Sequence, residues 1–120
     1  MITRIETHPA NASEVLLCAA NFGNSHVFRS IDAGALWTDI DRGQLPDVPH
    51  HALLLRPDKP NELWVCNDAG VFVTADDGAI WRNATNTLPP IMVVDLVYHT
   101  RTKSLLAATY GRSLWRLQLA

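Results

Sequence analysis

The sequence predicts an all-β protein that consists of repeated units of four short antiparallel strands. Three observations predict this class. The segment SIDAGALW at residues 30–37 returns as TADDGAIW at residues 74–81, which is an internal repeat. Short apolar runs are separated by turn-forming residues at strand-length intervals. No segment keeps the period of an amphipathic helix over several turns.

The repeat extends beyond this segment. Residues 14–18 (EVLLC) match residues 62–66 (ELWVC), and the Leu-Pro pair at 45–46 matches the pair at 88–89. A third copy begins near Val93 and stops without an Asp-x-Gly-x-x-Trp element. A spacing of roughly 40–45 residues is typical of a propeller blade. We therefore predict one domain over residues 1–120, with blades at about 2–44 and 49–88 and an incomplete blade at about 92–119.

The second unit shows the expected order of strands. They are expected at residues 51–56, 62–67, 71–74 and 80–84, with turns rich in Pro, Asp and Asn at 56–61 and 67–70. The first and second strands of each unit are apolar without alternation, as in ALLL and LLAA. Such runs are typical of strands that are covered on both faces. A sheet stacked between two other sheets is covered in this way.

The repeated Ser/Thr-x-Asp-x-Gly-x-x-Trp segment predicts a fold-back turn between the third and fourth strands. The Asp side chain can accept hydrogen bonds from backbone N–H groups further along the turn, and the Ser or Thr hydroxyl can join them. The Gly can adopt a positive φ, and the Trp ring is expected to be buried where the fourth strand begins. These residues are Ser30, Asp32, Gly34 and Trp37 in the first copy and Thr74, Asp76, Gly78 and Trp81 in the second.

The two copies of this segment resemble the Asp-box, or BNR repeat, of sialidase-like β-propellers, although Leu36 and Ile80 stand where Thr is usual. The ending AATYGRSLWRL at residues 107–117 is similar to the closing blade of bacterial Asp-box propellers. The resemblance implies about 2.75 blades of four antiparallel strands. Propellers close with roughly 4–8 blades. The expected partners are therefore the remaining blades of a larger propeller, which we favour, or copies of the chain in an oligomeric ring.

Composition sets limits on partners and compartment. The formal net charge is −2, with 48% apolar and 18% charged residues, which fits a globular domain and predicts no binding of nucleic acid or membrane. No apolar run approaches the roughly 20 residues of a spanning helix, and the N-terminus has no signal-peptide core. A chain complete as given is expected in the cytoplasm. Cys18 and Cys66 are expected to be buried free thiols rather than a disulfide.

A ligand is expected at the face formed by the loops between second and third strands and between successive blades, opposite the Asp-boxes. Arg112 could bind a carboxylate or a sugar hydroxyl, and Tyr110 could stack on a sugar ring. Asp68 and Asp47 could form an acid/base pair for glycoside hydrolysis. Asp95 lies in an apolar first strand, where a buried carboxylate needs a partner. For each of these residues we favour a structural role over a functional one.

Neither a metal site nor a cofactor is predicted. His50 and His51 are adjacent and turn apart on a strand, and His26 and His99 lack ligand spacing. The arginine cluster and the Tyr-Glu nucleophile of sialidases have no counterpart in recognisable context, and Glu14 and Glu62 recur at strand starts as structural residues. We therefore expect a non-catalytic β-propeller segment that binds protein or carbohydrate. The alternative is part of a sialidase-like or xyloglucanase-like glycoside hydrolase whose main catalytic residues lie in other blades.

Overall fold

The computed structural model describes residues 1–84, 92–111 and 114–119, and all of its regular elements are β-strands. This confirms the predicted all-β class. The strands form three antiparallel sheets. Sheet A contains β1 (Ile2–His8), β2 (Asn11–Ala19), β3 (Val27–Ser30) and β4 (Thr38–Asp39). Sheet B contains β5 (His50–Leu55), β6 (Leu63–Asn67), β7 (Gly70–Thr74) and β8 (Arg82–Asn83). Sheet C contains β9 (Val93–His99), β10 (Ser104–Thr109) and β11 (Leu114–Gln118).

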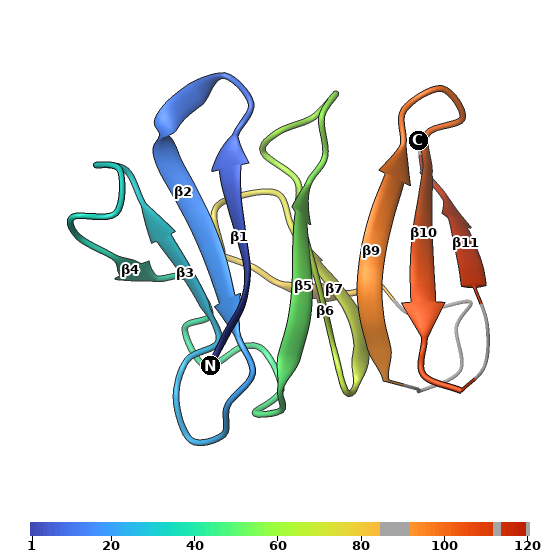
Figure 1. Cartoon of the computed structure of the whole chain (residues 1–120), viewed down its shortest axis with the longest axis horizontal. Coiled ribbons are helices and arrows are strands. Elements are labelled where there is room, and N and C mark those ends of the chain that lie inside the picture. The colour runs from blue at the N-terminus through green and yellow to red at the C-terminus, as the bar shows by residue number, and fades with distance from the viewer. Residues whose placement is uncertain (85–91, 112–113, 120) are drawn as a thin grey trace.

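The three sheets spread like a fan from their first strands. Strands β1, β5 and β9 lie side by side and contact one another in that order, and the later strands of each sheet extend away from them (Figure 1). Each sheet follows the chain as a simple meander. The described strands do not close into a ring. Within the described ranges, no helix is long and apolar enough to cross a membrane.

The strand registers show that the three sheets are built alike. In each sheet, paired residues of the first, second and third strands form a row across the sheet. The three side chains of a row point to the same face. The next row of paired residues points to the opposite face. The equivalent rows are Ile5–Leu17–Phe28 in sheet A, Leu53–Val65–Phe72 in sheet B and Leu96–Ala107–Trp115 in sheet C.

Two apolar cores lie on the two sides of sheet B, and its strands β6 and β7 are wholly buried. The core between sheets A and B contains Leu16, Cys18, Val27, Leu53, Val65, Phe72 and Trp81 among others. The core between sheets B and C contains Trp64, Cys66, Val71, Leu96, Leu105 and Ala107 among others. This explains why the second unit is apolar without alternation. Both cysteines are free and buried, as expected, and burial raises the pKa of each thiol.

The two repeated turns contain the expected hydrogen bonds. In the second turn, the Thr74 hydroxyl donates to Asp76 Oδ1 at 2.8 Å and accepts from the Gly78 N–H at 3.0 Å. Asp76 Oδ1 also accepts from the Ile80 N–H at 3.0 Å, and this bond contributes most to lowering the pKa of Asp76. The first turn repeats these bonds with Ser30, Asp32, Gly34 and Leu36. Both glycines have a positive φ, 95° at Gly34 and 84° at Gly78.

The second turn binds the neighbouring sheet rather than only its own hairpin. The Trp81 indole N–H donates to the Ile40 carbonyl at 2.8 Å, and Gln44 bonds the backbone of Trp81 and of Gly78. Trp81 is therefore 9% exposed. The equivalent Trp37 is 40% exposed, which corrects the expectation that the Trp ring of each repeated turn is buried. No sheet of the described residues lies against the first turn as sheet A lies against the second.

A buried arginine connects sheets B and C. Arg56 is 2% exposed and lies between Asp58 at 2.9 Å, Glu62 at 3.2 Å and the Tyr98 hydroxyl at 3.2 Å. Its guanidinium carbon also lies 5.4 Å from the centroid of the Tyr98 ring. Burial alone would lower the pKa of Arg56, but its bonds to Asp58, Tyr98 and Glu62 raise it above the ordinary value. Glu62 thus forms an ion pair within this contact, and Glu14 likewise pairs with Arg29 at 2.7 Å.

Candidate functional site

An open cavity of about 510 Å³ lies at one end of sheet A, between the β2–β3 loop and the β4–β5 connection. The β2–β3 loop and the β6–β7 turn are at the lower end of Figure 1, and the β1–β2 and β5–β6 turns are at the upper end. The cavity therefore opens at the face where loops were expected to hold a ligand. Its lining residues are Gly23, Asn24, Ser25, His26, Asp41, Gly43, Leu45 and Asp47.

His26 and Asp41 form the buried part of this site. Each side chain is 3% exposed, and His26 Nδ1 lies 2.8 Å from Asp41 Oδ2. The same carboxylate accepts the backbone N–H of His26 at 3.0 Å, and its other oxygen accepts the N–H of Leu45 at 3.1 Å. Asp41 therefore connects the two loops that line the cavity, and it fixes the position of the His26 ring.

Asp47 forms the exposed part of the site. Its carboxylate accepts the Gly23 N–H at 2.8 Å and lies 3.2 Å from His26 Nε2, which is also 3.1 Å from the Asn21 carbonyl. Both nitrogens of the His26 ring thus face oxygen acceptors only. The His26 ring therefore lies between the Asp41 and Asp47 carboxylates.

His50 is the buried neighbour of His26 in this cluster. The two rings are stacked, with centroids 4.6 Å apart. His50 Nδ1 lies 2.9 Å from the Val48 carbonyl, and Nε2 lies 3.1 Å from the Asn67 amide nitrogen. A neutral ring that donates from Nδ1 and accepts at Nε2 satisfies both contacts. Burial lowers the pKa of His50 to about 4.

We expect the protein to lose stability as the pH falls from about 6.5 to about 4, because the unfolded chain binds a proton on residue 50 in this range and the folded chain does not. His50 alone contributes about 3 kcal/mol to this loss. The measurement is the free energy of urea unfolding at a series of pH values. The variant His50→Gln keeps a neutral amide donor and acceptor there, and it should show a flatter profile. An equally steep profile in this variant would contradict the assignment.

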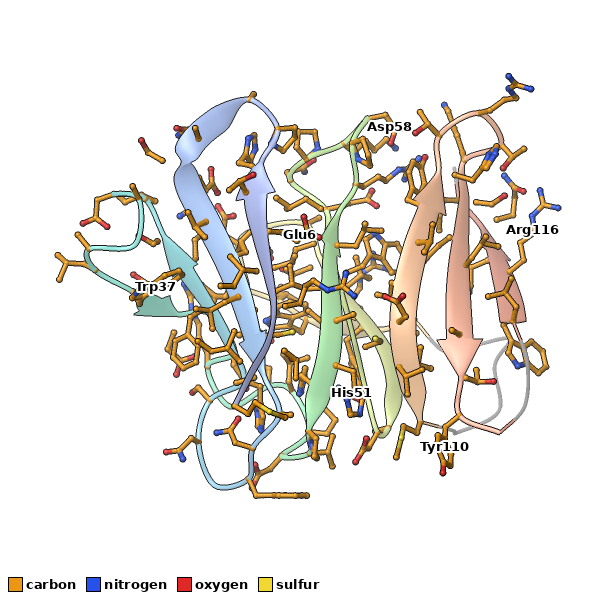
Figure 2. All side chains as sticks on the ribbon, viewed as in Figure 1. Glu6, Trp37, His51, Asp58, Tyr110 and Arg116 are labelled. Atoms are coloured by element: carbon orange, nitrogen blue, oxygen red, sulfur yellow. The ribbon has the colours of Figure 1, made fainter. Side chains whose placement is uncertain are left out.

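The two carboxylates that the sequence proposed as an acid/base pair, Asp47 and Asp68, bind different partners in the structure. Asp68 lies 2.6 Å from His51 Nε2, and Asp47 bonds Gly23 and His26, so each has its own set of partners. Tyr110 is exposed at the same end of the molecule as His51, and Asp58 lies at the other end (Figure 2).

The other two proposed residues are Asp95 and Arg112. Asp95 is not the buried carboxylate that its apolar strand suggested. Its side chain is about half exposed and pairs with Arg4 of β1 at 2.8 Å, because β9 is a first strand at the inner edge of its sheet. Arg112 lies outside the described residues.

Sequence reasoning missed the cluster of His26, Asp41 and His50. His26 and Asp41 lie in loops that were expected to line the ligand face, and His50 begins the strand that follows. That placement was the only available signal. His50 and His51 do turn apart, as expected: His50 bonds Val48 and Asn67 in the interior, whereas the partly exposed His51 bonds Asp68. In the parts of the chain that the structure describes, no three His, Cys, Asp or Glu side chains are arranged to hold a metal ion.

Comparison of the chain with known protein families and with curated protein sequences gives no match.

Proposed function

We propose that the three sheets are blades of an Asp-box β-propeller and that the chain is a non-catalytic scaffold that binds a protein or a carbohydrate. Three features support the architecture: the meander order of each sheet, the equivalent registers, and the fan with first strands innermost. The hydrogen bonds of the two turns support the resemblance to Asp-boxes.

The cavity between the β2–β3 loop and the β4–β5 connection is the observation that carries the binding role. It lies on the loop face, at the lower end of Figure 1. The Asp47 side chain, 60% exposed, offers carboxylate oxygens at its edge. Hydrogen-bond acceptors around an open cavity suit ligands that are rich in hydroxyl groups or carry a positive charge.

The hydrolase alternative has weaker support. A glycosidase needs two carboxyl groups that face one bond, separated by roughly 5–10 Å, with one acting as an acid. Asp47, Asp68 and Asp95 each bind a separate partner, namely His26, His51 and Arg4. These contacts are those of structural carboxylates, and no observation favours a catalytic pair over them.

Titration of isotope-labelled protein with soluble oligosaccharides tests the scaffold role. We expect shifts of the NMR amide signals of Gly23 and Gly43, which line the cavity. The signal of Gly34 should remain in place, because it lies in the first repeated turn and does not line the cavity. The variant Asp47→Asn should weaken the response. Hydrolysis of aryl glycosides that is lost in a folded Asp95→Ala variant would contradict the non-catalytic role and support the alternative.

A further inference from the structure

Sheet B contacts sheet A through one row of paired residues. The equivalent row in sheet A lies on its outer side, which faces away from sheet B. In sheet B this row is Leu53, Val65 and Phe72, and all three are buried against sheet A. The register assigns Ile5, Leu17 and Phe28 to the same places in sheet A. We call these three residues, together with Trp37, the open face of sheet A.

The exposed members of this face are Ile5 and Trp37, whereas Leu17 is buried and Phe28 is half-buried. Ile5 is 56% exposed, whereas its equivalent Leu53 is fully buried. Trp37 is likewise more exposed than its equivalent Trp81, at 40% against 9%. By contrast, Leu36 in the first turn and its equivalent Ile80 in the second are both exposed, so they do not belong to the contact between sheets. The comparison identifies which exposed apolar residues of sheet A are suited to a partner sheet.

Sheet C presents the complementary side. Sheet A covers sheet B with a face that contains Leu16, Cys18 and Val27. The registers place Leu106, Ala108 and Leu114 of sheet C in the equivalent positions, with Val97 beside Leu106. We call these four residues the open face of sheet C. Val97 is 53% and Leu114 is 61% exposed.

The charged residues near the open face of sheet C do not oppose such a contact. Asp95 shares a row with Ala108 and is already paired with Arg4. Arg116 occupies the position that Arg29 has in sheet A. Arg29 lies at the internal contact, where its Nε is 3.7 Å from Asp77 of the second turn. An arginine at this position is therefore compatible with a neighbouring sheet.

We propose that the open face of sheet C of one copy binds the open face of sheet A of a second copy, in the way that sheet A binds sheet B within the chain. This inference rests on the proposed assignment of the sheets as propeller blades. The contact joins two different surfaces, and two copies can form it twice, so that the pair closes on itself. The closed pair contains three sheets from each copy, and six blades are within the range of known propellers.

The test measures molar mass by sedimentation with two variants, Ile5→Glu for the open face of sheet A and Val97→Glu for the open face of sheet C. The chain is expected at about twice its 13.3 kDa, and each variant at the mass of one chain. An equimolar mixture of the two variants should return in part to twice that mass, because the mixed pair has one contact between two unchanged faces, whereas each variant alone has none. The control Ile80→Glu changes an exposed apolar residue outside both faces and should leave the mass doubled.

Circular dichroism establishes that each variant is folded before its mass is compared. A folded wild-type chain that remains a monomer at high micromolar concentration would overturn the proposal, as would a doubled mass that persists in both Glu variants. A series of larger masses that grows with concentration would overturn closure at two copies. A monomer whose cavity signals still respond to oligosaccharides would overturn the pairing alone and leave the scaffold role in place.

Discussion

The substitution Gly78→Ala should destabilise the protein by about 2–5 kcal/mol. Gly78 has a φ of 84°, a conformation that costs an alanine about 1–2 kcal/mol. A Cβ atom at this position would also lie 2.2 Å from the Ile40 carbonyl oxygen, so the turn and sheet A would have to separate. Forced overpacking of this kind costs about 1–3 kcal/mol more. Urea unfolding measures the change.

Gly34→Ala is the matched control for this prediction. Gly34 occupies the same place in the first turn, with a φ of 95°, but a Cβ there meets only the Trp37 ring at 3.5 Å. We expect a loss of about 1–2 kcal/mol from the backbone conformation alone. The difference between the two substitutions measures the contact of the second turn with sheet A. Equal losses at both positions would show that the turn does not bind its neighbour as described.

The substitution Arg56→Met should destabilise the protein by about 2–4 kcal/mol. It keeps a long apolar side chain but removes the hydrogen bonds to Asp58, Glu62 and Tyr98. The two carboxylates then lose their common partner at the contact between sheets B and C. They are partly exposed, at 29% and 20%, so water can hydrate them and reduce the loss. Arg56→Lys should recover only part of it, because an ammonium group lacks the planar fork of the guanidinium group.

Arg4→Met is the comparison for Arg56→Met. Arg4 also bridges sheets through a carboxylate, Asp95, but its side chain is 33% exposed. An exposed ion pair contributes about 0–1 kcal/mol, so this variant should be nearly as stable as the wild type. Thermal unfolding of the two variants at one pH provides the comparison. If Arg4→Met lowered the stability as much as Arg56→Met, burial of the arginine would not be what makes its ion pairs stabilising.

The sequence was sufficient to predict features that depend on local pattern. The spacing of Thr74, Asp76 and Gly78 predicted the hydrogen bonds of the second turn, because all partners lie within a few residues of one another. The apolar runs predicted that a central unit would be covered on both faces, and sheet B is. In each case the signal and its structural consequence lie close together in the chain.

Features that depend on a neighbouring sheet could not be predicted. Trp37 and Trp81 have nearly identical local sequences, yet one is exposed and the other buried, since only the second turn meets Ile40. The stacking of His26 on His50 likewise depends on how two loops meet, and the repeat pattern carries no record of it. Asp95 appeared buried by its apolar flanks, but its position at the inner edge of sheet C exposes it to Arg4 and solvent.

The accessibility of the two thiols is the most direct test of the stacked arrangement. Cys18 reports on the core between sheets A and B, and Cys66 reports on the core between sheets B and C. Single-cysteine variants, Cys18→Ala and Cys66→Ala, would be treated with a disulfide reagent such as dithiobis(nitrobenzoate). Both remaining thiols are expected to resist the reagent in native buffer and to react completely in denaturant, because burial keeps them inaccessible and protonated. Rapid reaction of either thiol in the folded protein would show that its core between sheets does not exist.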